Sequence, residues 1–190
     1  MTKLRDDLSF VESVNIPGTV TEIGESRFEK CTSLKHVTLA EGLKKILSDA
    51  FAYCTSLKNI NIPNTVEYIG SGAFAYCTSL QNINIPDGVK FVGLGAFAYC
   101  TSLKEITVSS AVEGIEDALV GANCKVNIKD GDKTYTFSSQ LFEAFSFKTI
   151  KKMAKMGTLN ALSPAVVTIK TKQTNQPIND SKPNKPTTFE

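Results

Sequence analysis

The feature that most constrains the fold of this chain is an internal repeat of 23 residues. Cysteine occurs at positions 31, 54, 77, 100 and 124, at intervals of 23, 23, 23 and 24 residues. The octet Ala-Phe-Ala-Tyr-Cys-Thr-Ser-Leu occurs three times, beginning at Ala50, Ala73 and Ala96. Segments 61–83 and 84–106 are identical at 15 of 23 positions. Such a period is typical of solenoids, in which each repeat packs only against its neighbours.

The apolar residues of one repeat predict a short strand, a bend and a helical turn. Ile83 and Ile85 alternate with polar residues, which is the period of a half-buried strand, and Pro86 ends it. Phe74 and Cys77 lie three residues apart, as on one face of a helical turn. Because a lone coil leaves its sides exposed, strands of successive coils should pair. We place these strands at 14–16, 37–39, 60–62, 83–85, 106–108 and 126–128.

A different pattern follows the last repeat. Asp130-Gly131-Asp132 predicts the turn of a hairpin that joins Val126–Ile128 to Thr134–Phe137. A helical pattern then begins at Ser138 or Ser139 and ends at Gly157, unless Ser146-Phe147 breaks it into two helices. This basic amphipathic segment either covers the apolar end of the last coil or binds a membrane surface or partner. We favour the cap, because a finite stack needs one.

Together these patterns predict an α/β repeat solenoid, with a parallel β-sheet on one face, helical turns elsewhere and a C-terminal helical cap. The expected divisions are an N-terminal cap and partial repeat, the repeat solenoid, a hairpin with the helical cap, and an extended or disordered tail. They span residues 1–13, 14–128, 129–168 and 169–190. Residues 165–169 are apolar enough to add one more strand.

The repeat also resembles a known family. The pattern Leu80-x-x-Ile83-x-Ile85-Pro86-x-x-Val89, with Gly-Ala-Phe-x-x-Cys upstream, is similar to the BspA-like branch of leucine-rich repeat proteins. The resemblance covers about residues 8–128. It implies a leucine-rich-repeat stack and a role like that of most BspA-like proteins, which are surface-exposed adhesion or host-interaction molecules of bacteria and protists.

Composition argues against several other functions. The chain has 21 Lys and Arg against 19 Asp and Glu, so its net charge of +2 gives no reason to expect nucleic acid as partner. No apolar run is long enough for a transmembrane segment. The only histidine, His36, should face outward while Cys31 faces inward, so a catalytic dyad is not expected. We therefore predict no enzymatic activity, no cofactor and no metal.

Residues that alternate with the buried strand positions should form two polar columns on the open face of the sheet. Solenoids use such extended faces for binding. The alternative is that stacked asparagines only cap the sheet through side-chain hydrogen bonds. We call this surface the strand face, and its candidate partner-binding residues are His36, Thr38, Asn59, Asn61, Asn82, Asn84, Glu105 and Thr107.

Aromatic residues predict a second surface. Tyr53, Tyr76 and Tyr99 lie next to the cysteines and should point away from the phenylalanines of the octet. Tyr68 and Phe91 share another position, where earlier repeats have Glu22 and Lys45. If these columns are exposed, they suit a protein interface. The alternative is that the rings only stack laterally within the coils.

The function expected from these features is a non-catalytic protein-binding or structural assembly module. A cell-surface adhesin-type domain that binds host or matrix proteins is the alternative. An intracellular location is favoured, because the N-terminal sequence is charged where a signal peptide is apolar and because five unpaired thiols suit a reducing compartment. The polar tail from Lys170 onward could latch onto a neighbouring chain.

Overall fold

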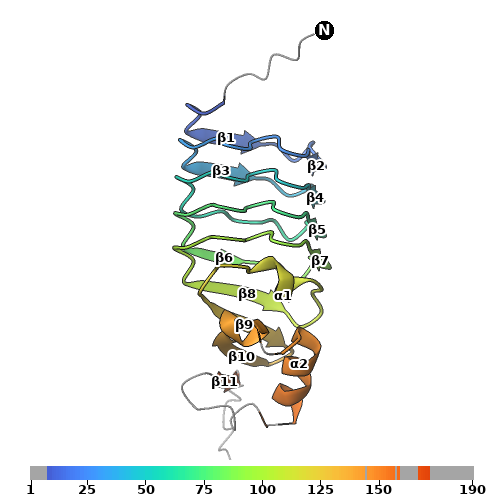
Figure 1. The fold of residues 1–190 in the computed structure, drawn as a ribbon. Coiled ribbons are helices and arrows are strands. Elements are labelled where there is room, and N and C mark those ends of the chain that lie inside the picture. The colour runs from blue at the N-terminus through green and yellow to red at the C-terminus, as the bar shows by residue number, and fades with distance from the viewer. Residues whose placement is uncertain (1–7, 144, 157, 159–166, 172–190) are drawn as a thin grey trace, which may run out of the picture.

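The computed structural model describes residues 8–143, 145–156, 158 and 167–171. Flat coils are stacked along one axis, with short strands on two sides of the stack and a mixed C-terminal unit at one end (Figure 1). The elements of the stack are β1 (Ser13–Ile16), β2 (Glu22–Ile23), β3 (His36–Leu39), β4 (Lys45–Ile46), β5 (Tyr68–Ile69), β6 (Asn82–Asn84), β7 (Phe91–Val92), β8 (Glu105–Ser109) and α1 (Ile115–Ala118). The C-terminal unit contains β9 (Lys125–Asp130), β10 (Lys133–Ser138), the 3₁₀-helix η1 (Ser139–Glu143), α2 (Phe147–Lys155) and β11 (Val167–Thr171).

The strands of the first side pair in parallel with a shift of one repeat. Ser13 pairs with His36 in β1 and β3, and Ile83 pairs with Ile106 in β6 and β8. This register confirms the repeat solenoid with a parallel sheet. It also places equivalent side chains of successive coils above one another.

The strand predicted at 60–62 does not form. Only an isolated bridge joins Asn59 to Asn82, so the first side is divided between a β1-β3 sheet and a sheet that begins at β6. The β1-β3 pair is extended by a hydrogen bond from the Ala40 N–H to the Ile16 carbonyl, of 3.1 Å. Pro63 and Pro86 occupy the same place as Ala40 in the next two coils and have no N–H to donate. The ladder is lost where these prolines occur.

A second parallel sheet, in the order β2-β4-β5-β7, was not predicted. Each of its strands has two residues, and Ile23, Ile46, Ile69 and Val92 are in register one repeat apart. These four side chains are buried, and the residue before each of them points outward. A single alternation per repeat is too short for a sequence pattern to indicate a strand.

The predicted helical turn is a hydrogen-bonded turn and not a helix. The Cys77 N–H donates to the Phe74 carbonyl at 3.2 Å, but the Phe74 and Tyr76 N–H groups donate to the next coil, at 2.8 Å each. Tyr53, Tyr76 and Tyr99 have positive φ angles of 61°, 59° and 56°, which a continuing helix excludes. The segment thus joins neighbouring coils by backbone bonds.

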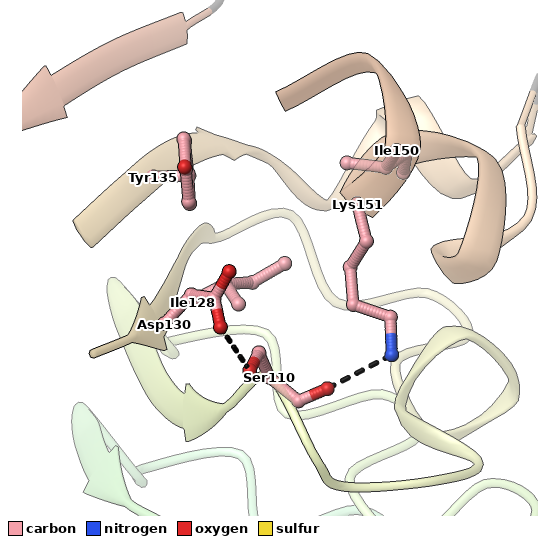
Figure 2. A pocket seen from close by; sticks show the side chains of 6 residues that line it. All are labelled: Ser110, Ile128, Asp130, Tyr135, Ile150 and Lys151. Atoms are coloured by element: carbon pink, nitrogen blue, oxygen red, sulfur yellow. Dashed lines mark hydrogen bonds between the residues drawn. The ribbon is translucent and has the colours of Figure 1, made fainter. Parts of the chain in front are cut away.

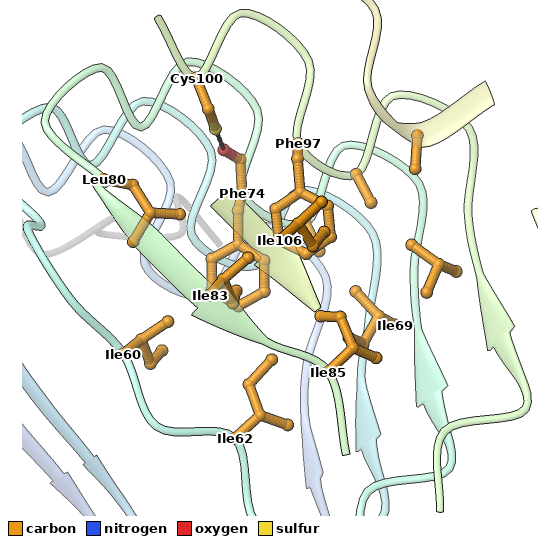
Figure 3. Close-up of a cluster of buried hydrophobic side chains, with 14 of the residues drawn as sticks. Ile60, Ile62, Ile69, Phe74, Leu80, Ile83, Ile85, Phe97, Cys100 and Ile106 are labelled. Carbon is orange, nitrogen blue, oxygen red and sulfur yellow. Dashed lines mark hydrogen bonds between the residues drawn. The ribbon is translucent and has the colours of Figure 1, made fainter. Parts of the chain in front are cut away.

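The core is built from columns of identical side chains. The rings of Phe28, Phe51, Phe74 and Phe97 stack with centroids 5.2, 5.4 and 5.5 Å apart, and the last three rings are fully buried. We call this the phenylalanine column; Figure 3 shows two of its rings among buried isoleucines. The Cys100 thiol donates to the Phe74 carbonyl at 3.2 Å, and Cys54 and Cys77 make the equivalent bond. All five cysteines are buried and none forms a disulfide, as the sequence predicts.

The last coil departs from the repeat. Leu119 takes the place of phenylalanine, as expected. The Ala122 N–H donates to Leu119 as Cys100 does to Phe97, so Ala122 and not Cys124 occupies the cysteine position. Cys124 lies two residues further on, where its N–H donates to the Ser139 hydroxyl at 3.1 Å.

The C-terminal unit closes this end of the stack. β9 pairs in parallel with β8 and forms the predicted hairpin with β10, which in turn pairs with β11. The helical segment is broken, as in the second alternative, and Ser146 Oγ accepts the Thr149 N–H at the start of α2. Phe147 and Ile150 of α2 are buried against the core, which supports the cap. Lys151 donates to the Ser110 carbonyl at 2.8 Å (Figure 2).

Two further expectations concern the chain end. The predicted strand 165–169 overlaps β11, but residues 165 and 166 lie outside the described residues. The predicted tail beyond Thr171 also lies outside them. In the part of the chain that the structure describes, no helix has the length and apolar character needed to span a bilayer.

Candidate interaction surfaces

The strand face lies where the sequence placed it. His36 and Thr38 of β3 are exposed and pair with Ser13 and Asn15 of β1. Further along the stack, the asparagines of β6 pair with Glu105 and Thr107 of β8. Every predicted residue of this face is exposed except Thr107, which is half-buried. The register therefore brings these side chains into two parallel columns.

The asparagines of the strand face are not bonded to one another. Among the described residues, the side chains of Asn59, Asn61, Asn82 and Asn84 make no hydrogen bond. A capping role for stacked asparagines requires such bonds between coils. Each amide has two N–H donors and a carbonyl acceptor that remain available to solvent or to a partner.

The strand face continues onto the C-terminal hairpin, which the sequence analysis missed. Thr107 of β8 is in register with Asn127 of β9, and Asn127 with Thr136 of β10. Here the side chains are bonded: the Asn127 amide donates to Thr107 Oγ1 at 3.4 Å, and Thr136 Oγ1 donates to Asn127 Oδ1 at 2.6 Å. This continuation could have been predicted, because Asn127 and Thr136 alternate with buried residues in their strands.

The tyrosine column, which comprises Tyr53, Tyr76 and Tyr99, is stacked along the coils. Its ring centroids are 4.6 and 4.7 Å apart, with interplanar angles of 4° and 16°. The Lys30 ammonium lies 6.0 Å from the Tyr53 ring centroid at one end. At the other end the Gly121 backbone lies so close that a Cβ there would be 2.7 Å from Tyr99. The facing sides of the three rings therefore cover one another, which agrees with lateral stacking, while Tyr53 and Tyr99 at the two ends remain 40% and 44% exposed.

Tyr68 and Phe91 also stack, with centroids 5.5 Å apart, but their surroundings differ. They lie in an open depression of about 450 Å³, whose other lining residues are Lys44, Lys45, Glu67 and Lys90. Phe91 is 38% exposed and Tyr68 is half-buried. The sequence predicts the two rings, and Lys45 only as the residue at their position in an earlier repeat, but not the grouping of Lys44, Glu67 and Lys90 around them. A sequence signal for the charged residues was available: Glu67 and Lys90 directly precede the two rings, and both also face outward.

Ion pairs link the charged residues of this depression. The Lys90 ammonium donates to Glu67 Oε2 at 2.6 Å, and the Lys44 ammonium is 3.9 Å from Glu67 Oε1. The hydrogen bond from Lys90, followed by its positive charge, lowers the pKa of Glu67. Glu67 is therefore a carboxylate at neutral pH.

The residues with chemical reactivity are not brought together. His36 is exposed on the strand face, whereas Cys31 is fully buried. Burial raises the pKa of Cys54 and Cys100 to about 12, so these thiols are neutral and unreactive at physiological pH. Within the described residues, no three His, Cys, Asp or Glu side chains are grouped to hold a metal ion.

The repeat and its register now allow comparison with known proteins. A model of the BspA type leucine rich repeat region matches residues 7–127 in six copies. The chain belongs to the BspA-type leucine-rich repeat family. Members of this family are protein-binding or structural repeat modules, and leucine-rich repeat proteins are typically non-enzymatic. No curated protein sequence matches the chain.

Two solved structures are similar to this BspA-type protein. One is the leucine rich repeat protein of T. pallidum, which is 31% identical, with a TM-score of 0.53 over 60% of this chain and 55% of that chain. The other is a leucine rich cell surface protein of Faecalibacterium prausnitzii, which is 30% identical, with a TM-score of 0.51 over 66% of this chain and 42% of that chain. The chain thus matches about half of the length of these proteins.

Proposed function

We propose that the protein is a non-catalytic protein-binding module whose partner lies across the strand face. The exposed side chains of the four asparagines of the strand face support this proposal most directly. Their amides are exposed and make no hydrogen bond within the described residues, so the fold does not use them. Because consecutive coils repeat this arrangement, a partner can form several hydrogen bonds along one column, as protein interfaces do.

The size and shape of the strand face suit this role. It extends from β1 to β10 and is made of strands in register, with an interruption at residues 59–62, where only a bridge from Asn59 to Asn82 continues the pairing. Extended faces of this kind are the usual binding surfaces of solenoids. Direct contacts of Asn, Thr and Glu side chains would supply specificity, since the face has no large apolar residue.

Site-specific photo-crosslinking tests the location of the partner. The photoreactive residue p-benzoylphenylalanine replaces Asn61 or Asn84 in the full chain, expressed in cells of its source, and Ser71 or Asp87 in two controls that are exposed elsewhere. Both strand-face positions should give an adduct with the same protein, and the controls should not. Equal adducts at all four positions, or none at Asn61 and Asn84, would contradict the proposal.

Alanine substitution separates binding from capping. In the double variant Asn61→Ala/Asn84→Ala, the free energy of unfolding should change by less than about 0.5 kcal/mol, as for surface substitutions. Capture of the crosslinked partner should be lost. A destabilisation above about 1 kcal/mol would indicate that the asparagines hold the coils together instead.

A second candidate is a cell-surface adhesin-type domain that binds host or matrix proteins. The similarity to the Faecalibacterium prausnitzii protein, which is described as a cell surface protein, favours it. An intracellular location is the prediction from the cysteines. Protease treatment of intact cells distinguishes the two: digestion of the protein supports the adhesin, and full protection until lysis supports the intracellular module.

A further inference from the structure

We propose that the depression around Tyr68 and Phe91 is a separate peptide-binding site, which accepts an acidic segment with an aromatic side chain. It goes beyond the proposed function, because it lies on the sheet of β4, β5 and β7 and not on the strand face. Its occupant is an acidic peptide segment of another protein. Three features support this site: the exposure of the two rings, the volume of the depression and the charge of the lysines around it.

The two rings are not required by the fold. Glu22 and Lys45 occupy the same position in the first two coils, in register with Tyr68 and Phe91. Both are exposed. A position that accommodates a carboxylate and an ammonium needs no aromatic side chain for packing. Aromatic residues are enriched at protein interfaces, where they supply contact area at low entropic cost.

The depression combines an aromatic floor with a charged rim. The stacked rings are inclined by 14°, and Phe91 is 38% exposed, so a partner ring can cover them. The stems of Lys44, Lys45 and Lys90 and the side chain of Glu67 complete the lining. The volume of about 450 Å³ lies within the range of roughly 300–1,000 Å³ found for ligand sites.

The rim charge selects an anionic partner. Three ammonium groups line the depression against one carboxylate, and Lys90 and Lys44 already pair with Glu67. Among the described residues Lys45 makes no ion pair, and its side chain is exposed. Glu22 and Glu113 lie beyond the two ends of the depression in the same columns. Lys45 is therefore the lysine of the depression whose charge is available to an incoming carboxylate, which gives electrostatic complementarity.

Side chains and not strand pairing must provide recognition here. β4 is hydrogen-bonded to β2 and β5, and β5 to β4 and β7. The other side of β7 is bridged to Glu113, whose carbonyl accepts the Val92 N–H at 2.9 Å, so these strands have no free edge at the depression. Addition of a peptide as an extra strand needs such an edge. The few charges also do not form the long basic stripe that nucleic acid requires.

Titration of the ¹⁵N-labelled full chain with short peptides tests the site. The probe is an acetylated and amidated Glu-Asp-Phe-Asp-Glu peptide, and its controls replace the acidic residues by lysine or the phenylalanine by alanine. The acidic aromatic peptide should give saturable shifts in the amide signals of Lys45, Tyr68, Lys90 and Phe91. Raising the salt concentration from 50 to 300 mM should weaken its binding at least threefold.

Variants taken from the equivalent positions should keep the fold intact, because each introduced residue already occupies that position in another coil. Phe91→Lys introduces the residue found at Lys45, and Lys45→Glu introduces the residue found at Glu22. Each should weaken binding of the peptide at least tenfold. Lys58→Glu, at an exposed lysine beside the strand face, should leave binding within twofold of the wild type.

Several results would overturn the proposal. They are the absence of saturable shifts, shifts confined to the strand face, equal binding of either control peptide, and unchanged binding by Phe91→Lys. None of these would affect crosslinking at Asn61 and Asn84, so the failure of this site is distinguishable from failure of the proposed function.

Discussion

At the scale of single residues, the direction of a side chain within its coil determines whether the side chain packs in the core or lies at the surface. Phe74 points inward and is fully buried between Phe51 and Phe97, at centroid distances of 5.4 and 5.5 Å. Tyr76 lies only two residues later, yet it stacks on the surface and is half-buried. Packing between the coils holds the phenylalanine ring at the inward position. The outward position lies at the surface, where its side chain has access to solvent.

Phe74→Ala should lower the free energy of unfolding by about 3–5 kcal/mol, because a cavity replaces a ring packed on both faces. Tyr76→Ala should lower the free energy of unfolding clearly less, since solvent can fill the space that the ring leaves at the surface. Urea unfolding of both variants and the wild type, followed by circular dichroism, provides the measurement. A cost below about 1 kcal/mol for Phe74→Ala would contradict the inward phenylalanine column.

The buried thiols predict a loss of stability at alkaline pH. Burial raises the pKa of Cys100 from 9.0 to about 12. Between these two values the unfolded chain loses a proton that the folded chain retains, so the free energy of unfolding falls as the pH rises. Below pH 9 this contribution is fully present. The slope is about 1.4 kcal/mol per pH unit for one such thiol.

Cys100→Ala isolates this effect, because Ala122 already occupies the equivalent position in the next coil. Between pH 9 and 10.5 the variant should lose stability less steeply than the wild type, by up to the contribution of one thiol. Urea unfolding at several pH values measures both slopes. Parallel curves would show that the Cys100 thiol titrates normally in the folded protein.

At the scale of elements, the sequence predicts what repeats and misses what depends on single exceptions. The alternation of apolar and polar residues around Ile83 and Ile106 predicted β6 and β8 to within two residues at either end. The same alternation at Ile60 gave no strand, because ladder bonds also require N–H donors that Pro63 and Pro86 lack. The left-handed φ of Tyr76 could not be predicted, since the bonds to the next coil that hold it are tertiary.

The candidate surfaces show the same division. The outward positions of the strand face followed from period two alone, and in the structure all of them except Thr107 are exposed. The rim of the depression at Tyr68 could not be predicted from this period, because Lys44, Lys45 and Lys90 come from three successive coils. Only the register of β4, β5 and β7 brings them together.

The α2 cap should stabilise the end of the stack that it covers. Ile150 is fully buried, so Ile150→Ala should lower the free energy of unfolding by about 2–5 kcal/mol. Because repeat stability depends on nearest neighbours, hydrogen exchange should become faster in β9 and β10 and change least in β3. Exchange that is unchanged in β9, or accelerated equally in β3, would contradict a capping role.

At the scale of the whole molecule, stacking separates stability from recognition. The middle coils share the same buried columns, whereas the outward residues differ between the two sides of the stack. One side presents polar amides, and the other presents aromatic rings among lysines. Under the two proposals above, one stack would contact two different partners without a change in its core.

Deletion of one complete repeat tests the in-register stack most directly. Removal of residues 61–83 joins Ile60 to Asn84 and recreates the Ile-Asn junction found at Ile83. This shortened chain should fold cooperatively, with the amide signals of β8–β10 close to those of the full protein and a lower free energy of unfolding. Removal of residues 61–79, which breaks the register, should abolish folding. Loss of folding in both deletions would contradict interchangeable coils.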